Sequence, residues 1–219
     1  MQRPSVQNDV HEIAAALSKD SAAVHDRFLD EKETRALAAC AALRSARGEF
    51  LGARIGANVE PHRAPHIRGD RICWLSEPLY PAERRVVAAL EQLRLACNRE
   101  AVLGLFDLEL HYARYAPGAG YARHVDRPRR DRCTGMPADA AVGARIVTIV
   151  LYLNSHWDGR TGGELRLFDA TFGHRDIAPL GGRLVCFLTE GREHEVLPAR
   201  RTRLSLTGWF RSRGVGAPF

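Results

Sequence analysis

The chain has 219 residues, which suits one globular domain with a substantial core. Its formal net charge of +6 favours an acidic partner only weakly, because the positive residues are nearly all arginines scattered along the chain. Five cysteines without a C-x-x-C pair argue against a disulfide framework or a zinc ribbon, and the absence of a secretion signal and of a membrane-length apolar run predicts a cytoplasmic protein.

Helical patterns dominate the first hundred residues. Residues 30–46 and 81–98 carry helical patterns, and in the second stretch apolar residues recur at helical spacing after Pro81, which suits a first turn. Between them, residues 52–74 are rich in Gly, Pro and Arg, which predicts an extended loop or hairpin that ends in a short strand. We expect amphipathic helices packed on a sheet, with a long loop that serves function.

From Leu105 onward the pattern changes to short segments of period two. The predicted strands are "DLELHYARY", "ARIVTIVLYL", "GELRLF", "GRLVCFL" and "RTRLSLTGWF", separated by "PGAG", "GRTGG" and "PLGG". Many short strands with glycine-rich turns indicate an antiparallel sandwich or barrel, here supported by helices.

The stretch "RHVDRP" contains a possible metal-binding pair. Side chains at i and i+2 of a strand share one face, so His124 and Asp126 could bind a single ion. His194, from a neighbouring strand, could supply a third ligand. Two imidazoles and one carboxylate on one face of an octahedron are typical of non-haem Fe(II) oxygenases.

A second H-x-D triplet makes spacing alone ambiguous. His156 and Asp158 lie in "NSHWDGRTGG", whose Asn, Asp and Gly content is typical of a turn. We therefore interpret that triplet as turn chemistry.

The strand that follows His194 has one polar and one apolar face. Arg201, Arg203, Ser205, Thr207 and Trp209 share one parity, and Leu204, Leu206 and Phe210 share the other. Arginine offers a planar fork of donors that matches a carboxylate, so Arg203 could hold the far end of a dicarboxylate. The alternative is an arginine in a surface ion pair.

Taken together, these motifs resemble the 2-oxoglutarate and Fe(II)-dependent dioxygenases of the prolyl 4-hydroxylase branch. The resemblance rests on the H-x-D pair, the distal His with Arg nine residues later, and on "YAPGAGYARHVD", "TIVLYLN", "GGELRLF" and "IRGDRICW". Within the branch, the chain is most similar to the oxygen-sensing prolyl hydroxylases of animals and their bacterial relatives.

The resemblance implies a mainly β fold, with a double-stranded β-helix (jelly-roll or cupin-like) core packed on N-terminal α-helices. It implies one domain over 1–219, with helical support and a finger loop at about 8–100 and the catalytic core at about 101–213. The finger, residues 52–70, would cover a protein substrate.

The resemblance also assigns site residues. It implies Fe(II) on His124, Asp126 and His194, the cosubstrate 2-oxoglutarate on Arg203, Tyr152 and Thr207, and the target proline near Tyr115, Arg145 and Trp209, with ascorbate as an optional cofactor. From sequence alone, Tyr152 and Trp209 would equally suit an ordinary core.

One segment departs from the animal enzymes. Residues 127–144 are longer here and contain Arg127, Arg129, Arg130 and Arg132 beside the metal motif, which puts the Arg145 match and the substrate in question. The expected partners are O2 and a protein with a target proline, with elongation factor Tu the first candidate because some bacterial relatives act on it. We expect these arginines to steer an acidic target.

Three alternatives stay open. A nucleic-acid demethylase of the same superfamily would suit the basic charge, but such enzymes usually have a second arginine six residues after the cosubstrate arginine, where this chain has Trp209. A hydroxylase of a free amino acid or small molecule depends on pocket size. A barrel that has lost its metal is disfavoured because all three ligands and the arginine are present.

Overall fold

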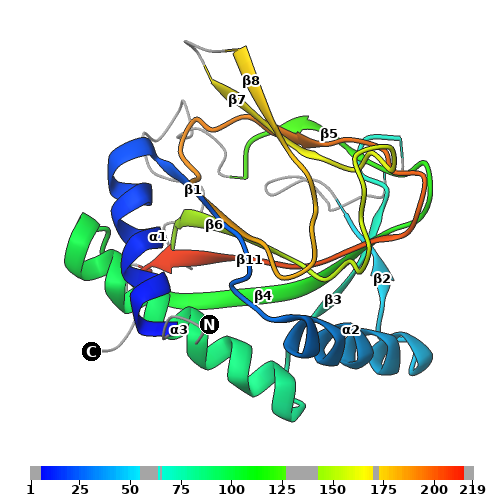
Figure 1. The fold of residues 1–219 in the computed structure, drawn as a ribbon, viewed down its shortest axis with the longest axis horizontal. Coiled ribbons are helices and arrows are strands. Elements are labelled where there is room, and N and C mark those ends of the chain that lie inside the picture. Colours follow the sequence, from blue (N-terminus) through cyan, green and yellow to red (C-terminus); the bar gives the residue numbers. More distant parts are fainter. Residues whose placement is uncertain (1–5, 55–63, 65, 127–142, 170–172, 215–219) are drawn as a thin grey trace.

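The computed structural model describes residues 6–54, 64, 66–126, 143–169 and 173–214, which form two antiparallel sheets and three helices. Figure 1 shows how these elements are arranged. The larger sheet has the order β1 (Ala22–His25), β9 (Leu184–Leu188), β6 (Arg145–Tyr152), β11 (Arg203–Ser212), β4 (Leu105–Tyr115), β3 (Asp70–Trp74) and β2 (Leu51–Gly52). The smaller sheet has the order β5 (Tyr121–His124), β10 (His194–Val196), β7 (Leu165–Asp169) and β8 (Gly173–Ile177).

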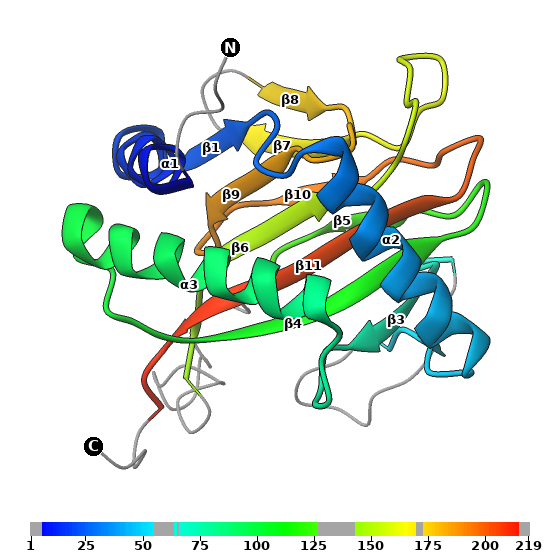
Figure 2. The same cartoon turned by 60° about the horizontal axis from the view of Figure 1, so that its bottom comes forward.

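The helices are α1 (Val6–Asp20), α2 (Glu31–Ala46) and α3 (Pro81–Ala101), and Figure 2 shows α2 and α3 lying across one face of the larger sheet. α2 begins at a capping box in which the Asp30 carboxylate accepts from the Glu33 amide, and the Glu33 carboxylate accepts from the Asp30 amide. α3 begins at Pro81, which needs no amide partner there. Both predicted helices are confirmed.

Two cores lie on opposite faces of the larger sheet. β6 shows why, since Val147, Ile149 and Leu151 pack toward the helices while Val150 and Tyr152 pack toward the smaller sheet. The predicted mainly β fold with a double-stranded β-helix core and supporting helices is confirmed. The core on the helical side contains residues from the predicted helical support and from the predicted catalytic core, which begins at about residue 101; Leu90 and Phe210 are examples.

Some elements differ from the sequence prediction. The first fifty residues supply a strand, β1, at the edge of the larger sheet, and residues 173–177 form the exposed strand β8. Asp126 does not lie on the strand that holds His124, because β5 ends at His124 and the chain bends before Asp126. None of the helices in the described ranges is long and apolar enough to cross a membrane.

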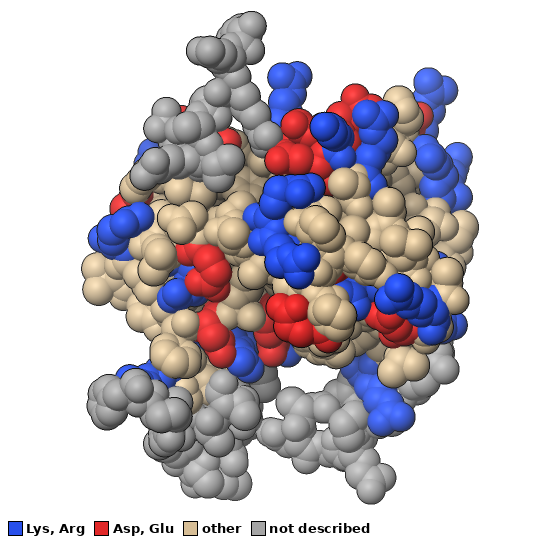
Figure 3. Space-filling view, turned by 90° about the horizontal axis from the view of Figure 1, so that it is seen from below, with Lys and Arg blue, Asp and Glu red and all other residues tan. Residues whose placement is uncertain are grey.

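Surface charge on the helical side is mixed. Figure 3, viewed from the side of α2 and α3, shows acidic and basic side chains interspersed. The excess of arginine therefore does not collect into one basic patch on this face. Elsewhere on the surface, arginines are also paired with carboxylates, such as Arg166 with Asp176 and Arg183 with Asp26.

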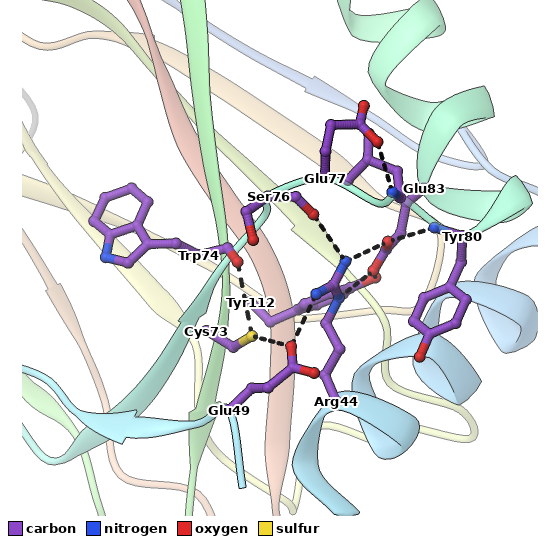
Figure 4. Close-up of polar contacts among 10 residues, drawn as sticks. Arg44, Glu49, Cys73, Trp74, Ser76, Glu77, Tyr80, Glu83 and Tyr112 are labelled. Carbon is purple, nitrogen blue, oxygen red and sulfur yellow. Dashed lines mark hydrogen bonds and ion pairs between the residues drawn. The ribbon is translucent and has the colours of Figure 1, made fainter. Parts of the chain in front are cut away.

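A buried ion pair joins the helices to the larger sheet (Figure 4). The Arg44 guanidinium of α2 donates to both carboxylate oxygens of Glu83 on α3, each at 2.8 Å, and Glu83 is fully buried. Tyr112 of β4 donates its hydroxyl to Glu83, and Glu49 accepts from Arg44. Burial favours the neutral acid, but these donors outweigh it and lower the Glu83 pKa.

We predict that Arg44→Met lowers the free energy of unfolding by about 3–5 kcal/mol, because it leaves the Glu83 carboxylate buried without its cation. Arg35→Met on the same helix is the matched control, since the Arg35–Glu31 pair is exposed and should contribute less than about 1 kcal/mol. Denaturant unfolding of both variants measures the difference. Equal losses would contradict the role of the buried pair.

Candidate active site

Three predicted ligands meet at one end of a cavity between the two sheets. His124 and His194 are cross-strand partners in β5 and β10, and Asp126 follows just beyond β5. Nε2 of His124 lies 3.5 Å from Oδ1 of Asp126, and Nε2 of His194 lies 3.6 Å from Oδ2. One ligand atom from each residue lies within 4.8 Å of the others, which is close enough to bind a single ion.

Backbone carbonyls fix the orientation of both imidazoles. The Nδ1 atom of His124 is 2.8 Å from the carbonyl of Ala122, and that of His194 is 3.1 Å from the carbonyl of Arg192. A carbonyl oxygen can only accept, so Nδ1 holds the proton in each neutral ring and Nε2 presents its lone pair to the site. This arrangement is typical of metal-binding histidines.

Asp126 is held in place by two donors from the larger sheet. Thr148 Oγ1 and Trp209 Nε1 donate to its Oδ2 atom at 2.8 and 2.9 Å. Burial acts to raise the pKa of Asp126, but His194, His124 and the Trp209 hydrogen bond hold it well below its usual value. The carboxylate is therefore ionised, as a divalent cation requires.

The second H-x-D triplet forms a turn. Oδ1 of Asp158 accepts from the Arg160 amide and the Thr161 hydroxyl, and His156 has a left-handed φ of 49°. In the described ranges, His124, Asp126 and His194 form the one cluster of His, Cys, Asp or Glu with metal-binding geometry. The turn interpretation of this triplet is confirmed.

A buried arginine lies in the same cavity. Arg203 is 2% exposed, and its Nε donates to the Gly163 carbonyl at 2.9 Å. Within the described part of the chain, no carboxylate lies at ion-pair distance from it. The Arg203 guanidinium lies 5.0 Å from the Tyr152 ring, and the buried Tyr152 hydroxyl has no hydrogen-bond partner among these residues. An unpaired buried cation beside an unpartnered hydroxyl fits a bound carboxylate.

The predicted polar face of β11 lines this cavity. Ser205 and Thr207 lie between Arg203 and Trp209, and their hydroxyls are 3.1 Å apart. Arg201 does not join them, because it precedes β11 and donates to the His156 carbonyl at the exposed surface. The cavity is lined by Arg68, Asp70, His111, Ala113, Tyr115, Tyr121, His124, Asp126, Thr148, Val150, Leu165, His194, Val196, Arg203, Ser205, Thr207 and Trp209.

The three residues predicted near a target proline do not lie together. The Arg145 guanidinium stacks 3.5 Å above the Trp209 ring at the Asp126 end of the cavity. Tyr115 is the register partner of Arg203, and its ring lies 5.3 Å from that guanidinium. Tyr115 therefore lies at the Arg203 end of the cavity, away from Trp209, because the pairing of β4 with β11 sets Tyr115 opposite Arg203 and Glu109 opposite Trp209.

Several cavity residues were not singled out from the sequence. Thr148 supports Asp126, and Tyr121 stacks on His124 with ring centroids 3.5 Å apart. The Asp70 carboxylate accepts two hydrogen bonds from the Arg68 guanidinium, which lies over the Tyr121 ring. Of these residues, Thr148 could have been identified from the alternation of side chains along its strand, because Thr148 and Tyr152 lie on the same face of β6.

Two predicted features lie partly or wholly outside the described residues. In the finger at 52–70, residues 55–63 and 65 are not described. The longer segment at 127–144 is described only at Gly143 and Ala144, so Arg127, Arg129, Arg130 and Arg132 lie outside it.

The paired sheets and the His–Asp–His cluster indicate a non-haem iron oxygenase. In agreement, a family model for the 2OG-Fe(II) oxygenase superfamily matches residues 110–211. A Pseudomonas putida prolyl-4-hydroxylase structure is 41% identical, with a TM-score of 0.80, and covers 94% of this chain and 100% of that one. A Trichoplax adhaerens prolyl hydroxylase, in complex with a hypoxia inducible factor peptide, is 26% identical, with a TM-score of 0.81, and covers 94% and 90%.

Human prolyl hydroxylase EGLN3 is 32% identical over 74% of this chain and 64% of its own length, and human Egl nine homolog 1 is 29% identical over 94% and 47%. The chain thus spans between about half and two thirds of these curated relatives. Given the match to the bacterial structure along its whole length, the chain belongs to the prolyl hydroxylase family of the 2OG-Fe(II) oxygenases.

We predict that Asp126→Ala abolishes tight binding of Mn(II), a spectroscopic substitute for Fe(II). Loss of a ligand should weaken binding by more than the roughly 10- to 100-fold typical of losing a residue that only supports a ligand. Asp158→Ala, in the other H-x-D triplet, is the control and should bind Mn(II) like the wild type. Electron paramagnetic resonance of free Mn(II) measures both, and an equal loss in the two variants would contradict the assignment.

Proposed function

We propose that the protein is a prolyl 4-hydroxylase that acts on a protein substrate and requires Fe(II) and 2-oxoglutarate. The observation that carries the proposal is the buried Arg203, without a carboxylate partner in the described ranges, in the same cavity as the His–Asp–His cluster. A cation site and a carboxylate site in one cavity suit a keto acid that reaches from one to the other.

Each group of residues has a role in this proposal. His124, Asp126 and His194 would hold the iron, and Arg203 with the Tyr152 hydroxyl would bind the distal carboxylate of 2-oxoglutarate, with Thr207 beside it. The bound iron and cosubstrate supply oxidising power, so that O2 and 2-oxoglutarate yield succinate, CO2 and one hydroxyl group on the substrate. Thr148 and Trp209 would keep the Asp126 carboxylate oriented throughout.

A prolyl residue in a protein loop is the substrate that the cavity suits. The Trp209 indole lines the cavity beside Asp126, with Arg145 over one side of the ring, and a proline ring packs well against aromatic side chains. The Trichoplax relative binds a peptide, which supports a polypeptide over a free amino acid. Elongation factor Tu remains the first target to test, and the four free cysteines of the described ranges suit the cytoplasm.

Arg203→Ala should raise the 2-oxoglutarate concentration needed for half-maximal turnover by more than about tenfold. Truncating one partner of a buried charged pair costs about 2–5 kcal/mol, and each 1.4 kcal/mol or so is one decade. Mn(II) binding should persist, because Arg203 is not one of the three clustered ligands. Arg201→Ala is the matched control. An unchanged requirement in Arg203→Ala would place the cosubstrate elsewhere.

The substrate proposal predicts a new 4-hydroxyproline in a host-cell extract incubated with the protein, Fe(II) and 2-oxoglutarate. Mass spectrometry of the digested extract, with purified elongation factor Tu run in parallel, identifies the modified loop. The Asp126→Ala protein is the control and should produce none. Faster oxidation of free L-proline than of any protein, or product found only on a nucleobase methyl group, would instead support one of the two rival enzyme classes.

A further inference from the structure

The cavity contains a buried histidine that the proposed chemistry does not use. His111 of β4 is 1% exposed, and its Nδ1 atom has no hydrogen-bond partner among the described residues. It lines the same cavity as Asp126 and Arg203. An unpartnered buried polar atom costs roughly 1–3 kcal/mol, so the fold is less stable with this nitrogen than with an apolar side chain of similar volume.

The environment keeps the imidazole neutral. Burial, with Arg68 and Arg145 nearby, lowers the His111 pKa to about 3, although Asp126 acts in the opposite direction. At neutral pH the ring therefore has one N–H donor and one acceptor nitrogen. A neutral group with one donor and one acceptor complements an uncharged amide better than a carboxylate or an ammonium group.

His111 also packs between two tryptophan side chains, one exposed and one beside the candidate metal site. It is the register partner of Trp74 on one side and of Thr207 on the other. Its ring lies 4.8 Å from that of Trp74, which is 46% exposed, and stacks 5.4 Å from the ring of Trp209 at an interplanar angle of 29°. Trp209 in turn donates to Asp126. His111 therefore packs between an exposed tryptophan and the tryptophan that supports Asp126, and it lines the cavity together with Trp209.

We propose that His111 is a substrate-binding residue, which donates or accepts a hydrogen bond with a main-chain amide next to the residue that is hydroxylated. This inference rests on the proposed function and specifies how the polypeptide is recognised. A loop substrate brings main-chain amides, which are neutral donor and acceptor groups, to the cavity that His111 lines. Arg203, a cation without a carboxylate partner in the described ranges, is the better match for the cosubstrate carboxylate.

The test uses the peptide in which the wild type forms hydroxyproline, with His111→Leu and His111→Asn in the full chain. Leucine fills a similar volume without nitrogens, so it should raise the KM for the peptide at least about fivefold, with kcat and the 2-oxoglutarate requirement within twofold of the wild type. Asparagine restores an amide near the Nδ1 position and should recover most of the affinity. The melting temperature of His111→Leu should be unchanged or higher, because an unpartnered buried group has been removed.

Tyr80→Phe is the matched control. The Tyr80 hydroxyl is also buried without a hydrogen-bond partner in the described ranges, but it does not line the cavity. Its removal should likewise not lower the melting temperature and should leave the KM for the peptide unchanged. A smaller rise in peptide KM for His111→Leu, a rise in the 2-oxoglutarate requirement instead, or a loss of stability would each overturn the inference. Absence of hydroxyproline with the wild type would overturn the proposed function itself.

Discussion

The alternation of side chains along β11 is the constraint on which both the core and the cavity depend. Leu204, Leu206 and Phe210 pack toward the helices, while Arg203 and Trp209 face the smaller sheet. β11 pairs with β4 on one edge and β6 on the other, so its register is fixed from both sides. A slip of one residue would bury an arginine among leucines and send Phe210 into the cavity, which makes the register strongly specified.

The buried Arg44–Glu83 pair extends this constraint to the edge of the sheet. The network includes Cys73 on β3, whose thiol lies 3.8 Å from the Glu49 carboxylate. In Figure 4, Cys73 points into this network and the Trp74 indole points away from it, because neighbours on a strand face opposite sides. The ion pair thereby helps to hold Trp74 against His111, which lines the cavity. A polar cluster on the helical side thus supports an aromatic surface on the other.

The elements that sequence reasoning located best are those with a strong period. Residues 81–98 show helical spacing, and the strand of Arg203 alternates in polarity, so each follows from its own residues. Residues 30–46 follow instead from their alanine-rich sequence and the capping box at Asp30. β1 is too short to show a period and forms because β9 offers it a pairing edge. Asp126 was expected on a strand, but its position depends on donors far away in sequence, Thr148 and Trp209. His111 gave no signal, since the lack of a partner is a property of the folded cavity.

Buried polar atoms without partners are unusual in folded proteins, and their placement is informative. Of the three such side-chain atoms in the described ranges, one belongs to Tyr152 beside Arg203 and another to His111 beside Trp209. Together with the His–Asp–His cluster, the cavity presents three unmet requirements of different chemistry, for a cation, a carboxylate and a neutral amide. Under the proposed function, these groups would be paired by a metal ion, a keto acid and a polypeptide amide, and the fold tolerates the cost of the buried unpaired atoms for that reason.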